Sequence, residues 1–95
     1  MWRIEEHRLA DKELLSGRVP LKILKHYEKW KDVATVSGPI GLRAINGFRD
    51  EALSGDWKGH RSSRLYQQWR VIYQVVAGTL LVEVIRVTPH DDRRS

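Results

Sequence analysis

The sequence predicts a small α+β domain in which an N-terminal strand and two helices precede a three-stranded antiparallel sheet, with the helices on one face. Two observations lead to this class. Between residues 20 and 46, apolar residues recur at the three-to-four spacing of amphipathic helices. From residue 59 onward, short runs alternate apolar and polar residues, as strands do. Ninety-five residues suffice for one domain, spanning 1–95, around one core.

The chain begins with a short strand. Residues 2–7 alternate, with Trp2 and Ile4 on one side and charged residues on the other. Residues 9–18 are polar and show little period, so we expect a loop or a single helical turn there. The first strand is thus followed by an irregular link.

Two helices are expected next. Pro20 suits a first helical position, and the apolar period continues to about residue 36. Ser37-Gly38-Pro39 then predicts a stop and a new start, because glycine ends helices and proline opens them. A shorter helix should therefore cover about 39–46.

The rest of the chain is expected to form the sheet. Residues 47–58 predict a loop that leads into strands at about 59–66, 68–76 and 79–88, with Ala77-Gly78 as a tight turn. The last of these strands has apolar residues on both of its faces, which indicates a central strand or one with a bulge.

Strand parity places two arginines together. In the strand at 59–66, Leu65 marks the core side, which directs His60 and Arg64 to the opposite side. In the next strand, Val71 marks the core side and Arg70 points away from it. We therefore expect Arg64 and Arg70 on the same open face of the sheet.

Charge is unevenly distributed. The net charge is +5, and residues 57–82 contain no acidic residue although they carry Lys58 and several arginines. Such asymmetry fits a sheet that faces a polyanion, and a solvated basic face is the alternative.

Composition argues against several classes. The chain has no cysteine, so thiolate metal sites and disulfides are excluded, and its four histidines lack paired metal-ligand spacing. It has no phosphate-loop motif, no signal-like leader and no apolar run that could span a bilayer. We expect a cytoplasmic protein that needs no cofactor or metal.

A few side chains suit phosphodiester chemistry. Arg64 and Arg70 could clamp a phosphate through their planar guanidinium groups, or could simply keep the sheet soluble. His90 follows the last strand and could move a proton, or could be an ordinary surface histidine. Glu51 could accept a proton from a ribose 2′-hydroxyl, although an exposed loop glutamate is the simpler interpretation.

Other residues are candidate RNA contacts. Lys58 and Arg61 are expected to reach outer phosphates, and His60 lies on the same strand face as Arg64. Tyr66 could stack on a base, as aromatic residues do in readers of single-stranded RNA.

An ordered series of short motifs resembles the RelE/ParE superfamily of type II toxin–antitoxin toxins, closest to the HigB/YoeB-like mRNA interferases. The series runs Gly-Phe-Arg-Asp-Glu-Ala-Leu from Gly47, Gly-His-Arg-Ser-Ser-Arg-Leu from Gly59, Trp-Arg-Val-Ile-Tyr from Trp69, and Val-Thr-Pro-His-Asp from Val87. The similarity covers roughly residues 40–94, and the order of the predicted strands agrees with that fold.

The resemblance implies a toxin that cuts mRNA in the ribosomal A site and is held inactive by a cognate antitoxin protein. It further implies that Glu51 acts as the base, that Arg64 and Arg70 stabilise the phosphate, and that His90 completes the site. The implied reaction is attack of the 2′-oxygen on the adjacent phosphate, which leaves a 2′,3′-cyclic phosphate and a 5′-hydroxyl.

Two positions depart from the family pattern. Asp91 stands where relatives commonly have tyrosine, and Tyr66 stands where many have asparagine. An aspartate cannot stack on a base and repels phosphate, so we expect weakened activity unless Asp91 orients His90. Asp91 leaves a non-catalytic module that binds RNA or antitoxin as one alternative, and an inhibitor of DNA gyrase, as in ParE, is the alternative within the same superfamily.

Overall fold

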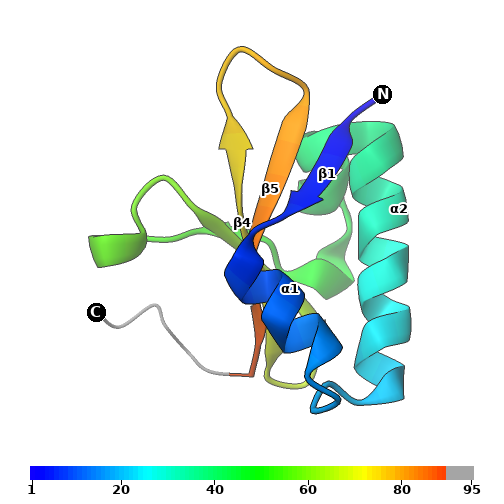
Figure 1. Ribbon diagram of the computed structural model, residues 1–95. Coiled ribbons are helices and arrows are strands. Elements are labelled where there is room, and N and C mark those ends of the chain that lie inside the picture. Colours follow the sequence, from blue (N-terminus) through cyan, green and yellow to red (C-terminus); the bar gives the residue numbers. More distant parts are fainter. Residues whose placement is uncertain (90–95) are drawn as a thin grey trace.

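The computed structural model describes residues 1–89 and shows five strands in one mixed sheet of order β1-β5-β4-β3-β2. Figure 1 shows this sheet with α2 packed along it. In chain order, the elements are β1 Arg3–Glu6, α1 Arg8–Leu15, α2 Leu21–Ala44, the 3-10 helix η1 Asn46–Phe48, β2 Glu51–Ala52, the 3-10 helix η2 Gly55–Trp57, β3 Arg61–Tyr66, β4 Trp69–Val76 and β5 Leu81–Thr88. The predicted α+β class is confirmed.

The last strand is central, as its pattern indicated. β5 pairs in parallel with β1 and antiparallel with β4, so it is flanked on both sides. It also has a bulge: Ile72 faces Arg86 while the next residue, Tyr73, faces Val84, which leaves Ile85 without an opposite residue. Both features that the apolar pattern allowed are present.

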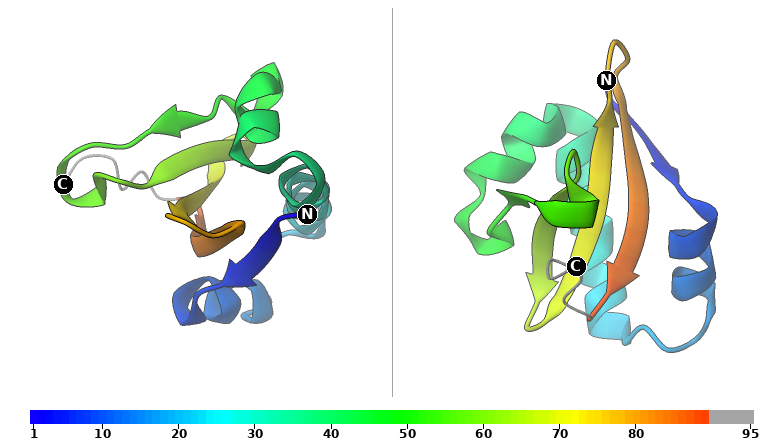
Figure 2. Two further views of the ribbon diagram at one scale, coloured as in Figure 1. Left: turned by 90° about the horizontal axis from the view of Figure 1, so that it is seen from above. Right: turned by 90° about the vertical axis from the view of Figure 1, so that its left-hand side faces the viewer.

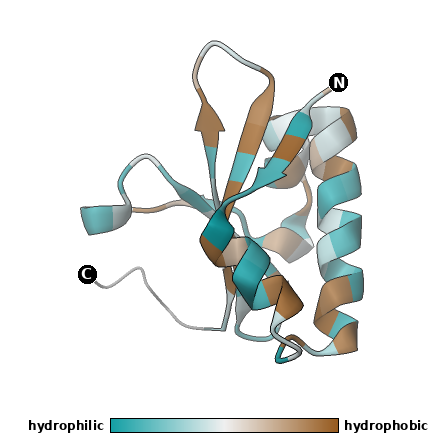
Figure 3. Cartoon of the chain, in the orientation of Figure 1, coloured by the Kyte–Doolittle hydropathy of each residue, from teal (hydrophilic) through white to brown (hydrophobic). Residues whose placement is uncertain are grey.

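The main core lies between the sheet and α2. Tyr27 and Trp30 of α2 are buried and stack on each other with ring centroids 5.9 Å apart. Trp30 meets Tyr73 of β4 edge-on at 5.4 Å. Aromatic contacts of this kind add to the free energy gained from apolar burial. Figure 3 shows the apolar segments of β4 and β5, whereas the hairpin before β3 is largely hydrophilic.

The predicted break between two helices is present as a kink within α2. Gly38 has φ 65° and ψ −161°, which is non-helical, and Pro39 continues the helix beyond it. The Trp2 indole lies against the Gly38 backbone, so closely that a Cβ at position 38 would be 2.4 Å from Trp2 Nε1. Glycine is required here for both its positive φ and its lack of a side chain.

The expectation of a loop or single turn over residues 9–18 was wrong, because residues 8–15 form α1. The Nδ1 atom of His7 accepts a hydrogen bond from the Leu9 amide and caps this helix at 3.1 Å. α1 runs along β5 beyond the end of β1, at the edge of the sheet (Figure 2). Ala10 of this helix is buried and Leu14 packs against the core, so α1 is stabilised by tertiary packing.

The predicted loop over 47–58 also contains ordered structure. Its two-residue strand β2 pairs with β3 through Glu51 opposite Ser62 and Ala52 opposite Arg61. This pairing extends the sheet and fixes the direction of the side chains that precede β3. Within residues 1–89, no helix has the length and apolar character needed to cross a membrane.

Candidate functional site

Arg64 and Arg70 lie together, as strand parity predicted. They are direct partners across the β3–β4 pair, so their side chains leave the sheet on the same side. That side is opposite to the one on which Val71 and Tyr73 join the α2 core. Arg70 is only 8% exposed and Arg64 is half-buried.

These arginines line a small cavity of about 130 Å³. Its lining consists of Arg49, Glu51, Ser62, Arg64 and Arg70. Among the described residues that line the cavity, three guanidinium groups outnumber one carboxylate. Guanidinium groups bind phosphate oxygens in fork geometry, so the site fits a phosphate with a carboxylate beside it.

The position of Glu51 follows from the short strand β2. Glu51 pairs with Ser62, which lies on the same face as Arg64, two residues further along β3. The strand pair therefore brings this carboxylate to the cavity although it is twelve or more residues away from both arginines in sequence. A loop glutamate on an irregular segment would have no such fixed position.

A buried carboxylate lies directly behind the cavity. The side chain of Asp50 is fully buried and accepts hydrogen bonds from Arg61 Nε at 2.6 Å, Ser63 Oγ at 2.6 Å and Tyr73 Oη at 2.5 Å. Burial raises the pKa of Tyr73, and the hydrogen bond to Asp50 and its charge raise it further. Burial lowers the pKa of Arg61, but the bond and charge of Asp50 outweigh this and raise it overall.

Two expected RNA contacts lie elsewhere. Arg61 points to the α2 side of the sheet and is paired with Asp50, which places it on the side opposite to Arg64 and Arg70. Tyr66 stacks on His26 at 5.4 Å and lies under Lys22 Nζ at 4.1 Å, because the irregularity between Arg64 and Tyr66 changes the register. Its ring thus packs against residues of α2, and its expected role in stacking on a base stays a prediction.

The remaining candidates lie at the edge of the site or outside the described residues. Lys58 is exposed and His60 is half-buried against the Trp57 ring at 5.1 Å, and neither lines the cavity. His90 and Asp91 lie outside the described residues 1–89. β5 does bring Thr88 opposite Arg70, two residues before His90 in the sequence.

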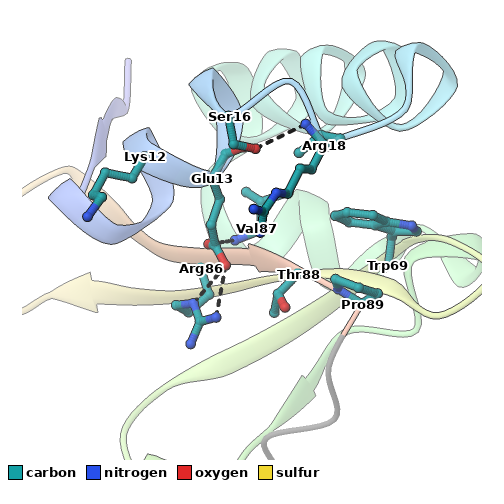
Figure 4. Close-up of a pocket in the computed structure, with 10 residues that line it drawn as sticks. Lys12, Glu13, Ser16, Arg18, Trp69, Arg86, Val87, Thr88 and Pro89 are labelled. Carbon is teal, nitrogen blue, oxygen red and sulfur yellow. Dashed lines mark hydrogen bonds and ion pairs between the residues drawn. The ribbon is translucent and has the colours of Figure 1, made fainter.

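A larger cavity of about 550 Å³ lies between α1 and the end of β5 (Figure 4). Its carboxylate, Glu13, accepts bonds from both Arg86 Nε and Arg86 Nη2 and from the Val87 amide at 2.9–3.0 Å. Those bonds join α1 to the edge of β5 where β1 has ended. Glu13 and Arg86 of this cavity are thus bonded to each other and hold α1 to β5, while Lys12 and Arg18 also line it.

Sequence reasoning missed Arg49 and Asp50. Arg49 adopts a left-handed conformation with φ 44° and lines the small cavity. The carboxylate of Asp50 points the other way, so the two neighbours serve opposite faces of the sheet. Among residues 1–89, no three His, Asp or Glu side chains gather as a metal site would require.

Comparison with known proteins gives the fold. Neither a family model nor a curated protein sequence matches the chain. Among solved structures, a YoeB/ParE toxin from Agrobacterium tumefaciens is 19% identical, with a TM-score of 0.72, and the match covers 94% of this chain and 99% of the toxin. The chain has the fold of RelE-type toxins. The archaeal RelE–RelB complex from Pyrococcus horikoshii OT3 matches at 21% identity and TM-score 0.72, over 96% of this chain and 97% of that one.

A further neighbour with the RelE-type fold was solved as part of a complex. The heterotetrameric YoeB–YefM toxin–antitoxin complex from Staphylococcus aureus matches at 16% identity and TM-score 0.69, over 96% of this chain and 99% of the matched chain. The resemblance inferred from the short motifs is therefore confirmed at the level of the fold. At identities of 16–21%, the likeness is one of fold.

Proposed function

We propose that this chain is the toxin of a type II toxin–antitoxin pair and that it cuts mRNA in the ribosomal A site. The observation that carries the proposal is the cavity in which Arg64 and Arg70 lie beside Glu51. Neighbours of the same fold are described as toxins and, in one case, as part of a toxin–antitoxin complex. The expected partners are thus a cognate antitoxin protein and mRNA on the ribosome.

The site residues can be given roles in a single displacement. Glu51 accepts the proton of a ribose 2′-hydroxyl as its oxygen attacks the adjacent phosphorus. The bond from phosphorus to the 5′-oxygen breaks, which leaves a 2′,3′-cyclic phosphate and a 5′-hydroxyl once that oxygen gains a proton. We assign donation of this proton to His90, two residues beyond Thr88.

The two strand arginines stabilise the charge that develops during this step. Negative charge grows on the phosphate oxygens as the fifth bond to phosphorus forms, and fixed guanidinium groups offset it without reorganising. Arg70 contributes most in this scheme because a nearly buried charge is screened less by water. Ser62, which is buried at the base of the cavity, offers a hydroxyl to the same group.

The direct test is cleavage of a defined mRNA in a purified translation system. We expect the wild-type chain to truncate the message at the A-site codon. Arg70→Gln and Arg64→Ala should each reduce the rate by about 10²–10³, the usual loss when one stabilising donor is removed. Arg43→Ala, an exposed arginine at the end of α2, is the matched control and should keep full activity.

The same assay separates the alternatives. Intact mRNA together with impaired DNA supercoiling would replace the nuclease proposal by the gyrase-inhibitor alternative. Intact mRNA with retained antitoxin binding and no effect on gyrase would indicate the non-catalytic module. Equal cleavage by wild type and Arg70→Gln, with both folded, would remove the cavity from the reaction.

Asp91 gives a separate prediction about activity. If its charge weakens binding of the phosphate, Asp91→Tyr should increase the cleavage rate, and Asp91→Asn should give part of that increase. The comparison isolates charge from stacking, because asparagine removes the charge but supplies no ring. An unchanged rate for both variants would show that position 91 lies outside the site.

A further inference from the structure

We propose that Arg49 is a third phosphate-binding arginine of the cavity, and that Asp50 is the positioning residue that holds it there. This inference rests on the proposed binding of a polyanion at the cavity. It adds a role for two neighbouring residues that neither strand parity nor the family resemblance identified.

Arg49 reaches the cavity through an unusual backbone conformation. It follows η1 with φ 44° and ψ 46°, the left-handed region that residues with a Cβ seldom adopt. Its amide donates to the Asn46 carbonyl at 3.1 Å, which closes the turn. Only residue 50 separates Arg49 from β2, so the position of Arg49 also depends on what fixes the chain at that residue.

Asp50 supplies that fixed point. Its fully buried carboxylate receives three hydrogen bonds, one of them from the charged Arg61, at 2.5–2.6 Å. The donors come from β3 and β4, so the bonds join the residue before β2 to the adjacent strand β3 and, beyond it, to β4. Asp50 also lies between two cavity residues, Arg49 and Glu51, whose backbone positions it therefore determines.

The same hydrogen bonds pair Arg61 with Asp50 and so keep the Arg61 guanidinium away from the cavity. Because Asp50 neutralises Arg61 on the α2 side, the guanidinium groups that line the cavity on the open side are those of Arg49, Arg64 and Arg70. The exposure of these three decreases from Arg49, which is exposed, to Arg64 and then to Arg70, which is buried. Arg49 is thus at the rim, where it would meet an incoming strand first.

This position predicts a role in binding rather than in the chemical step. Contacts made equally in the bound and transition states change KM and leave kcat unaltered. A rim arginine that neutralises one phosphate also contributes to the salt dependence of binding, by about 0.7 in the slope of log K against log salt for a single strand. That slope reports a phosphate contact and does not change with folding stability alone.

The experiment uses the full chain and a short single-stranded oligoribonucleotide with 2′-O-methyl groups, which no 2′-oxygen can cleave. Fluorescence anisotropy at several salt concentrations gives Kd and the salt slope for wild type, Arg49→Ala, Asp50→Asn and the double variant. We expect Arg49→Ala to weaken binding by about threefold to tenfold and to reduce the slope by about 0.7. Asp50→Asn should reproduce both changes, and the double variant should be no worse than either single one.

Controls separate positioning from loss of fold. Arg43→Ala removes an exposed arginine elsewhere and should leave the slope unchanged. Tyr73→Phe removes one of the three bonds and keeps the charge of Asp50, so it should weaken binding by less than Arg49→Ala does. This variant keeps the inference testable if Asp50→Asn does not fold.

Additive losses in the double variant, or an unchanged slope in Arg49→Ala, would overturn the inference, as would a wild-type chain that does not bind the oligonucleotide. The nuclease proposal fails separately, because a chain that binds with the expected slopes yet leaves mRNA intact would retain this inference and lose the reaction.

Discussion

Two buried tyrosine hydroxyls make the folding stability of the protein depend on pH. Tyr73 donates to Asp50, and Tyr27 of α2 donates to Glu6 of β1 at 2.6 Å. Burial raises the pKa of both phenols, and the hydrogen bond and the negative charge of each carboxylate raise it further. The native state therefore holds both protons at pH values where the unfolded chain has lost them.

The sign of the effect follows from proton binding. Above the ordinary tyrosine pKa of 10.0, the native state binds more protons than the unfolded state, so stability falls as pH rises. Each phenol should contribute a decrease of about 1.4 kcal/mol per pH unit in that range. Below pH 10 this contribution is constant.

Tyr73→Phe tests this directly. Urea unfolding between pH 8 and about pH 11 should show a slope less steep by about 1.4 kcal/mol per pH unit in the variant than in wild type. The variant should also be less stable at neutral pH, because Asp50 loses one donor. Parallel pH profiles above pH 10 would contradict the assignment of a raised pKa to Tyr73.

Sequence alone could locate the side chains of Arg64 and Arg70 but not those of Asp50 and Arg49. Alternation within one strand gives the direction of each arginine side chain, since Leu65 and Val71 mark the core side. Asp50 lies in a polar segment without alternation, and an acidic residue in such a segment is expected to be exposed to solvent. Only its position next to Glu51, and hence opposite Ser63 across β2 and β3, turns it inward.

At the level of elements, the kink in α2 depends on one contact between distant parts of the chain. Gly38→Ala should destabilise the fold by about 1–3 kcal/mol, because the new Cβ would strike the Trp2 indole and a positive φ disfavours alanine. Gly47→Ala is the matched control, since nothing lies within 4 Å of a Cβ there. Thermal unfolding measures both.

The double variant with Trp2→Ala separates the two causes. If the collision dominates, Gly38→Ala should cost much less in the Trp2→Ala background than in wild type. If backbone strain dominates, the two losses should add. A Gly38→Ala variant as stable as Gly47→Ala would show that neither cause operates.

Elements with their own sequence pattern were predicted, and those that depend on distant partners were not. α2 and the strands β3, β4 and β5 carry the period of a helix or a strand, and their bounds came out close to those predicted. α1 is stabilised by Glu13, whose partners on β5 are more than seventy residues away in sequence. β2 has only two residues, which is too short for alternation to show.

In the molecule as a whole, the two faces of the sheet have different roles, one in stability and the other in the proposed chemistry. One face packs on α2 and holds the apolar core, and the other carries the arginine cavity. Because side chains alternate, sequence neighbours such as Arg70 and Val71 belong to different functions. The fold can thus hold several arginines close together while the apolar residues beside them supply the free energy of folding.

This division predicts opposite outcomes for residues on the two faces. Val71→Ala should lower the free energy of unfolding by about 2–3 kcal/mol, since it removes buried methyl groups and leaves a cavity. The folded fraction of that variant should still cleave mRNA at the wild-type rate. Arg64→Ala should do the reverse, with the melting temperature nearly unchanged and cleavage reduced by about 10²–10³. Thermal melts and single-turnover rates of the same preparations give both quantities, and a Val71→Ala variant that is stable but inactive would mean that the two faces are coupled.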